Sequence, residues 1–520
     1  MKSFLAAAAV ILLALAGAAQ DAGRQSPFES TAAPDVKNRI DEIVFAALKK
    51  QGIRPARLSS DAVFVRRVYL DAIGTLPTAD EARGFIEDRD ANKRSVLIDR
   101  LLAREEFADY WAMKWCEVLR VKSEFPINLW PNAVQAYHRW IRTAIRDNVP
   151  YDRFARELLT ASGSNFRDAP VNFYRAVQSR EPEAIASTVA LTFMGARTDA
   201  WPKERLAGMA AFFSQIAYKS TGEWKEEIVY FDPDKAGPRT ATAPDGTGVR
   251  LEPGQDPREA FASWLTAPGN PWFARAAVNR TWFWLVGRGI VHEPDDIRAD
   301  NPPSHPELLA FLERELVASR FDMKQVHRLI LNSSAYQLSS IPASTPPPPD
   351  NSFACALKRP LDAEVLIDAL NQITGMSEQY SSAIPEPYTF IPPDQRSIAL
   401  ADGSIRSAFL ETLGRPPRDT GLASERSAQP TAAQRLYLLN SGDVQRKLQQ
   451  GPKLQALLQR QGGPREVTNA LYLTILSRYP TEEELRAITE YSQAGGANRR
   501  GVAQDLAWAL INSAEFGFRH

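Results

Sequence analysis

The pattern that decides the fold reads Tyr69-Leu70, Leu76-Pro77-Thr78-Ala79-Asp80-Glu81, Ala91-Asn92-Lys93-Arg94 and Glu105-Glu106-Phe107. It returns about four hundred residues later as Tyr472-Leu473, Tyr479-Pro480-Thr481-Glu482-Glu483-Glu484, Ala497-Asn498-Arg499-Arg500 and Ala514-Glu515-Phe516. The second copy differs by two insertions of three residues, and each insertion is close to one turn of an α-helix. We therefore predict one helical supersecondary unit that is used twice and stands at both ends of the mature chain.

Helix start signals extend this prediction along the chain. A Thr or Ser followed three residues later by Glu or Gln forms a capping box, which satisfies free N–H groups at the start of a helix. Such boxes are predicted at Thr78–Glu81, Ser304–Glu307 and Thr431–Gln434. Between 220 and 253 the pattern changes to a β-rich run, Glu227–Phe231, followed by turn residues. The fold is therefore predicted as mainly α and multi-helical, with a small β-containing insertion near 220–253.

Changes in composition divide the chain into predicted segments. A signal peptide (1–19) and a linker (20–36) precede an N-terminal helical domain (37–165). The chain continues with a connecting helical and β segment (166–253), a second helical domain (254–342), a Pro-rich linker (343–352) and a C-terminal helical region (353–520). The second copy of the 69–107 pattern lies in this last region.

The N-terminus is typical of a secretory signal peptide. Lys2 precedes an apolar run from Phe4 to Leu15, and the small residues 16–19 follow it. The run is too short to span a bilayer comfortably, and no later apolar stretch reaches the length of about eighteen residues that a span requires. The sequence thus predicts an exported protein, periplasmic or extracellular, without a membrane span in the mature chain.

The charge balance and the cysteines exclude several kinds of partner and cofactor. The chain has 62 basic and 62 acidic residues and no long Lys/Arg run, which argues against nucleic acid as a partner. No C-x-x-C or C-x-x-C-H occurs, so neither a zinc ribbon nor covalent c-type haem is predicted, and we expect no metal and no cofactor. Cys116 and Cys355 would pair in an oxidising compartment or stay as free thiols, and both alternatives stand at this point.

The densest polar cluster lies between predicted helices, at residues 279–305. As a catalytic site it would use His292, Asp295, Asp296 and His305 as acid–base groups or ligands. Its candidate binding residues are Asn279, Arg280 and Arg288. The alternative is structural: the carboxylates accept backbone N–H groups and pair with the arginines, and Ser304 caps a helix. We favour the structural interpretation.

Tryptophan supplies a second candidate for binding. Ten of the eleven tryptophans precede residue 285, and exposed rings would stack on sugar rings. Most of them lie on apolar helical stripes, where aromatic side chains usually belong to the core. Glycan binding requires at least two exposed, coplanar rings, and it is kept as an alternative.

Several long motifs resemble those of one bacterial family. They include Tyr69-Leu70-Asp71, Tyr110-Trp111, Pro150-Tyr151-Asp152-Arg153-Phe154, Val278-Asn279-Arg280-Thr281-Trp282, Gly287-Arg288-Gly289, Asn301-Pro302-Pro303-Ser304-His305-Pro306 and Asn332-Ser333-Ser334-Ala335-Tyr336-Gln337. With them the chain is similar to the paired domains of unknown function numbered fifteen forty-nine and fifteen fifty-three, which occur in secreted proteins of planctomycetes and acidobacteria. The resemblance covers nearly the whole mature chain and implies no established activity.

Two departures from the family pattern bear on function. Similar proteins carry a C-x-x-C-H segment where this chain has Thr198–Trp201, and a second cysteine-bearing stretch where it has Gly421–Ser424. The resemblance implies the hypothesis that these thiols form one metal or haem site in relatives and that this member has lost it. The hypothesis fails if the two segments stand on opposite faces of the protein.

These observations lead to three interpretations. The first is an exported protein of unknown biochemical activity that binds an envelope protein or a polysaccharide, or serves as a cell-envelope scaffold, and has lost its relatives' Cys/His site. The second is an extracytoplasmic hydrolase that acts on a polymer, which requires the side chains of the 279–305 loop to meet in an open cleft. The third is a glycan-binding protein that uses exposed Trp residues. Whether the protein is an enzyme stays open at this point.

Overall fold

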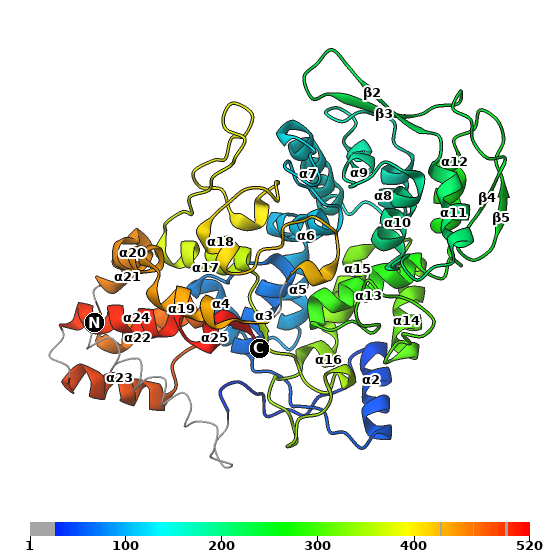
Figure 1. The fold of residues 1–520 in the computed structure, drawn as a ribbon. Coiled ribbons are helices and arrows are strands. Elements are labelled where there is room, and N and C mark those ends of the chain that lie inside the picture. The colour runs from blue at the N-terminus through cyan, green and yellow to red at the C-terminus, as the bar shows by residue number, and fades with distance from the viewer. Residues whose placement is uncertain (1–25, 427–428, 461, 495–497) are drawn as a thin grey trace.

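The computed structural model describes residues 26–426, 429–460, 462–494 and 498–520, and the protein is mainly α-helical, as predicted (Figure 1). The predicted signal peptide lies outside these residues. Within the described ranges, no helix is both long enough and apolar enough to cross a bilayer.

The elements follow one another in four groups, in which η marks 3₁₀ helices and, for η2, a π-helix. The first group is α2 (Arg39–Lys50), α3 (Asp61–Ile73), α4 (Ala79–Glu87), α5 (Lys93–Leu102), α6 (Glu105–Val118), α7 (Pro131–Arg146) and α8 (Tyr151–Thr160). The second is β1 (Gly163–Ser164), η1 (Ala169–Val171), α9 (Asn172–Arg175), α10 (Pro182–Val189), η2 (Ala190–Met194), α11 (Lys203–Ala210), η3 (Ala211–Phe213), β2 (Ile216–Ser220), β3 (Glu227–Phe231), β4 (Thr240–Thr242) and β5 (Gly248–Arg250). The third is α12 (Pro257–Leu265), α13 (Phe273–Val286), α14 (Pro306–Ala318), α15 (Met323–Asn332), α16 (Ser334–Gln337) and η4 (Asp350–Ser352). The fourth is β6 (Arg359–Pro360), α17 (Ala363–Thr374), η5 (Ser397–Ala399), α18 (Ala408–Thr412), η6 (Ala423–Glu425), α19 (Ala432–Asn440), α20 (Gly442–Gln450), α21 (Pro452–Leu458), α22 (Pro464–Leu476), α23 (Glu482–Ala494), α24 (Arg499–Ile511), α25 (Ala514–Gly517) and β7 (Phe518–Arg519).

The predicted β insertion is present as two small antiparallel sheets. Strand β3 occupies the predicted run and lies between β1 and β2, while β4 and β5 form a hairpin. A third pair joins distant parts of the chain, because Arg359 of β6 stands opposite Arg519 of β7. This pairing carries the last residues of the chain into the middle of the fold.

Both copies of the sequence pattern fold as the same order of helices. The first covers the end of α3, then α4, α5 and the start of α6, and the second covers the end of α22, then α23, α24 and α25. The two stretches touch, since the Tyr479 hydroxyl donates to Glu87 (2.8 Å). Just before the first copy, the Arg66 guanidinium on α3 donates to the carbonyls of Ile475 (2.8 Å) and Phe516 (2.9 Å). Helix α22 packs against α4, and in Figure 1 α25 (red) lies beside α3 and α4 (blue). One buried apolar core includes residues of all four predicted helical segments, 37–165, 166–253, 254–342 and 353–520, from Ile40 to Phe516.

Two of the three predicted capping boxes are confirmed. Thr78 with Glu81 and Thr431 with Gln434 form both reciprocal hydrogen bonds. The box at Ser304 is wrong: α14 begins one residue later than predicted, and the Ser304 hydroxyl donates to the carbonyl of Ile290 (3.1 Å). The Glu307 carboxylate forms an ion pair with Arg39 (2.7 Å) instead of a cap hydrogen bond.

The structure decides between the two alternatives for the cysteines. Cys116 and Cys355 are both free thiols. Cys116 is fully buried in α6, and this burial raises the pKa of its thiol to about 12. It is therefore a core side chain without thiolate reactivity at neutral pH.

Candidate functional site

Two of the candidate side chains of the 279–305 loop meet in the structure. Arg280, on α13, pairs with Asp295 (Nη2–Oδ1 3.1 Å), and both side chains are at most 2% exposed. The Asn279 side chain instead holds the loop backbone at Val291. Its amide N–H donates to the Val291 carbonyl, and its amide oxygen accepts from the Val291 N–H, both at 2.9 Å.

The other candidates of this loop lie apart. His292 lies at the surface. Its pKa is lowered, because neighbouring residues still remove part of its hydration and because the Arg288 charge is near. Asp296 pairs with Arg298 (3.3 Å). His305 is buried against the ring of Phe353 (5.1 Å between centroids), and burial lowers its pKa. The seven side chains therefore share no open cleft, and most of their described contacts are with the loop's own backbone and arginines.

The tryptophans divide between core and surface. Trp111, Trp115 and Trp282 are buried, whereas Trp224 is 58% exposed. Trp224 contacts Trp130 (4.6 Å, 72° between planes) and Tyr388 (5.0 Å, 60°). The rings of this surface cluster pack edge-on against one another, so they do not present the coplanar pair that stacking on a sugar requires.

A cavity of ≈110 Å³ lies where α6 and α13 meet the segments 359–363 and 413–426. Five basic side chains of the described residues line it: Lys114, Arg280, Arg359, Arg426 and Arg519. Three acidic side chains line it as well: Glu117, Asp295 and Asp362. We call it the ionic cavity. Positive charge exceeds negative charge on its wall.

Segments that are far apart in the sequence position these side chains. Tyr110, Lys114 and Glu117 are spaced by four and three residues, which places them on one face of α6. Asp362 immediately precedes α17, at the helix end where the dipole favours a carboxylate. Arg519 arrives through the pairing of β7 with β6.

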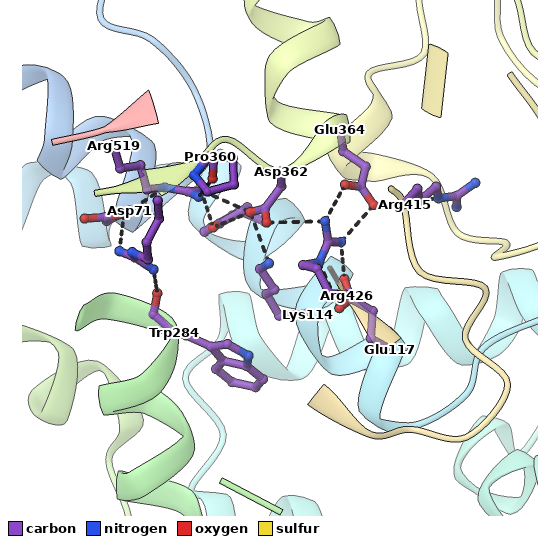
Figure 2. A network of polar contacts seen from close by, with 12 residues as sticks. Asp71, Lys114, Glu117, Trp284, Pro360, Asp362, Glu364, Arg415, Arg426 and Arg519 are labelled. Atoms are coloured by element: carbon purple, nitrogen blue, oxygen red, sulfur yellow. Dashed lines mark hydrogen bonds and ion pairs between the residues drawn. The ribbon is translucent and has the colours of Figure 1, made fainter. Parts of the chain in front are cut away.

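Arg426 is the centre of the network on one side of the cavity (Figure 2). Its guanidinium makes two parallel hydrogen bonds to Glu364, both of 2.9 Å, and a third of 2.6 Å to Glu117. Asp362 lies 3.3 Å from it. Such bidentate, charge-assisted bonds hold a guanidinium in one orientation.

Asp362 joins this centre to the end of the chain. It accepts from the Lys114 ammonium (3.1 Å), the Arg519 guanidinium (3.0 Å) and the Tyr110 hydroxyl (3.2 Å). Arg519 reaches further to Asp71 (3.0 Å). The network thus links the N-terminal helices, the segment before α17 and the C-terminal strand.

The same charges set the ionisation of the acids. Burial opposes ionisation of Asp362, but the charges of Lys114, Arg426 and Arg519 outweigh it and hold its pKa well below the usual value. Burial likewise opposes ionisation of Glu364, whose pKa Arg426 nevertheless lowers to about 2. Burial and the charge of Arg426 lower the pKa of Lys114. The buried carboxylates are therefore ionised at neutral pH.

The cavity wall keeps hydrogen-bond donors without acceptors. An ammonium group has three N–H donors, and among the described residues Asp362 is the one acceptor that Lys114 reaches. The buried Nε atoms of Arg280 and Arg359 also lack a partner in the described part of the chain. Glu364 and Asp71 lie directly behind the wall and offset its excess of basic side chains, so it is the free donors that make the cavity suited to an anion.

The two family segments that lack their thiols are joined to one loop through contacts of residues in or next to them. Gly195 accepts from the N–H of Ile297 (2.8 Å), and Arg197 pairs with Glu293 (2.6 Å). Between these two contacts, Asp295 accepts from the N–H of Ala423 (2.6 Å). Arg197, the residue before Thr198–Trp201, and Ala423 of Gly421–Ser424 therefore both contact the same short loop, 293–297.

Sequence reasoning did not identify most residues of the ionic cavity. Lys114 lies among Trp111, Met113, Trp115 and Cys116. A lysine within such an apolar run is unusual, because buried lysines need a partner, and it is the feature of the sequence that could have indicated this site. Arg519 and Arg426 carried no comparable signal, because only tertiary pairing brings them to α6.

Comparisons with known families agree with this architecture. Residues 39–217 match a family described as "Protein of unknown function (DUF1549)", and residues 257–492 match one described as "Protein of unknown function (DUF1553)". Neither a curated protein nor a solved structure matches the chain.

Proposed function

Because the chain belongs to the family of paired DUF1549 and DUF1553 domains, whose descriptions name no activity, we propose its function from the ionic cavity. The protein is an exported binding protein of the cell envelope that holds a small oxyanion in this cavity. The bound group is a carboxylate, sulfate or phosphate, either free or at the end of a larger envelope compound.

The size of the cavity supports a small ligand group. Its volume of ≈110 Å³ compares with about 30 Å³ for each water molecule in the liquid. It is smaller than the roughly 150 Å³ cavity known to hold benzene. An oxyanion of a few heavy atoms fits this space, while the body of a larger molecule would remain outside.

The observation that carries the proposal is the state of Lys114. Its ammonium is buried on the cavity wall with one described acceptor, so two N–H donors remain for a ligand. A buried cation left with unfilled donors is costly unless a ligand or water fills them. The carboxylates of the network do not accept hydrogen bonds from these two remaining donors, because Glu117 is already bound to Arg426 and Asp362 to Arg519.

A thermal-shift panel tests the proposal on the purified mature protein. We expect acetate, sulfate or phosphate to raise the melting temperature in a saturable way, because a ligand that binds only the folded state stabilises it. Lys114→Met should remove this rise and still fold, since Asp362 keeps Arg426 and Arg519. Lys219→Met, on the exposed part of β2, is the matched control. The proposal is refuted if the oxyanion raises the melting temperatures of Lys114→Met and Lys219→Met equally. It is also refuted if the oxyanion raises the melting temperature of the wild type no more than chloride does.

The loss of the relatives' thiol site is the second part of the proposal. It is supported by the contacts that Arg197, next to Thr198–Trp201, and Ala423 make with the 293–297 loop, because one site needs its ligands close together. We expect the purified protein to contain neither stoichiometric metal nor c-type haem, since it has no C-x-x-C-H for covalent attachment. Elemental analysis and an absorption spectrum check this, and a haem band or one metal per chain would exclude it.

A further inference from the structure

A second and larger cavity opens beside the first copy of the sequence pattern. Its volume is ≈440 Å³, within the roughly 300–1,000 Å³ of small-molecule sites. It is bounded by residues 75–81, 104–106, 368–377 and 394–396 and by Lys453. We call it the polar cleft. It shares no lining residue with the ionic cavity.

The chemistry of the polar cleft differs from that of the ionic cavity. Four acidic and three basic side chains line it, so its charges nearly balance. Three carboxamides, Asn371, Gln372 and Gln395, and the hydroxyl groups of Thr75, Thr78 and Ser377 add neutral donors and acceptors. A lining of this kind fits a ligand that is uncharged and carries many hydrogen-bonding groups.

Two charged side chains of the cleft have no partner. Within the described ranges, the Lys453 ammonium and the Asp394 carboxylate make no hydrogen bond and no ion pair, although both line the cleft. The stem of Lys453 lies against Gly375, where an added Cβ would come within 2.7 Å of it. Gly375 has φ +75° and leaves room for this stem.

The chain itself offers a comparison for this cleft. In the first copy of the pattern, Arg104 pairs with Glu81 (2.9 Å) and Glu106 and lies over the ring of Tyr69. In the second copy, the corresponding Tyr472, Glu484 and Glu515 surround Arg478 in the same way. The arginine comes from a different position of the pattern in each copy, yet the cluster is the same.

The two clusters differ in exposure. The side chains of Arg478, Glu484 and Glu515 are 4%, 9% and 11% exposed, so the second cluster is sealed. Those of Arg104, Glu81 and Glu106 are 28%, 35% and 24% exposed and line the polar cleft. The sealed cluster shows this arrangement in a purely structural role, whereas the open cluster exposes its carboxylates and guanidinium to the polar cleft.

We propose that the polar cleft binds a neutral sugar unit of an extracellular polysaccharide. Carboxylates, carboxamides and guanidinium groups each offer two hydrogen-bonding atoms in one plane, which matches pairs of neighbouring hydroxyls. Glu81, Arg104 and Glu106 form one wall of this site, and Lys453 stands at its rim. Leu76 and Met376 supply apolar contact for the C–H groups of the sugar. This site is separate from the anion site and does not depend on Lys114.

Titration of the full mature protein with neutral trisaccharides of glucose, xylose and N-acetylglucosamine tests this inference. We expect one of them to bind in a saturable way, and Arg104→Gln and Lys453→Met each to weaken binding about tenfold. Lys453→Met retains the fold because this side chain has no described partner. Arg478→Gln is the matched control, and it should lower the melting temperature while leaving the affinity unchanged.

Three results would overturn the inference. They are the absence of saturable binding by the wild type, unchanged affinity in Arg104→Gln and Lys453→Met, and an equal loss of affinity in Arg478→Gln. Lys114→Met is expected to bind the sugar as the wild type does, so failure at the polar cleft and failure at the ionic cavity are told apart.

Discussion

Replacing Arg426 by methionine is expected to lower the free energy of unfolding by about 3–5 kcal/mol, the usual effect of removing one partner from a buried ion pair. The variant leaves Glu117 and Glu364 without their shared guanidinium, and the Glu364 side chain is 1% exposed. Glu364 then keeps only the more distant Arg415 (3.7 Å) as a cation among the described residues, and a buried carboxylate with so weak a partner either stays charged at high cost or takes up a proton. Chemical denaturation of both proteins at neutral pH measures the difference.

The matched control for this prediction is Arg39→Met. Arg39 also bridges two carboxylates, Glu42 (2.6 Å) and Glu307 (2.7 Å), but its side chain is 52% exposed. Exposed pairs contribute little to the free energy of unfolding, because water screens them, so this variant should lose far less stability than Arg426→Met. Equal losses in the two variants would show that burial of the network does not matter and would contradict the description of the site.

Stability is expected to fall steeply as the pH drops from about 4.5 to about 2. In the unfolded chain Glu364 titrates at its ordinary pKa of 4.5, whereas in the folded protein its pKa is lowered to about 2. As the pH falls, the unfolded state therefore takes up the proton first. The stabilisation that ionised Glu364 gives to the folded state is complete above pH 4.5 and is lost as the pH approaches 2. Asp362 acts in the same direction, because its folded pKa is also lowered.

The variant Glu364→Gln tests the origin of this acid dependence. Its glutamine cannot ionise, so the free energy of unfolding should vary less with pH between 4.5 and 2 than in the wild type. Denaturation series at several pH values give the two slopes. Identical slopes would mean that Glu364 does not titrate as the ion pair requires.

The sequence predicts the helices better than it predicts the site. Thr78–Glu81 and Thr431–Gln434 form the predicted caps because a capping box is a local arrangement of four residues. The box at Ser304 fails because two tertiary contacts compete for it: the carbonyl of Ile290 engages Ser304, and Arg39 engages Glu307. A capping box is readable in the sequence where distant partners leave its capping atoms free: Glu81 pairs with Arg104 through one oxygen and still caps the helix with the other.

The ionic cavity depends almost entirely on such distant partners. Lys114, Asp362, Arg426 and Arg519 belong to four segments, and the pairing of β6 with β7 brings the last of them into place. Of the residues predicted from the polar loop, Arg280 and Asp295 line the cavity. The density of polar residues in the sequence points to these two, but tertiary packing sets the distances in the cavity, for example where the rings of Trp115 and Trp284 join α6 to α13 (5.8 Å between centroids).

Isothermal titration of the mature protein with the oxyanion that stabilises it most tests the central claim directly. One site per chain is expected, with binding about 10- to 100-fold weaker in Lys114→Met, since a hydrogen bond to a charged group contributes about 1.5–3 kcal/mol. Lys219→Met should bind like the wild type. Unchanged affinity in Lys114→Met, or no binding heat from acetate, sulfate or phosphate, would contradict the assignment of the ionic cavity as an anion site.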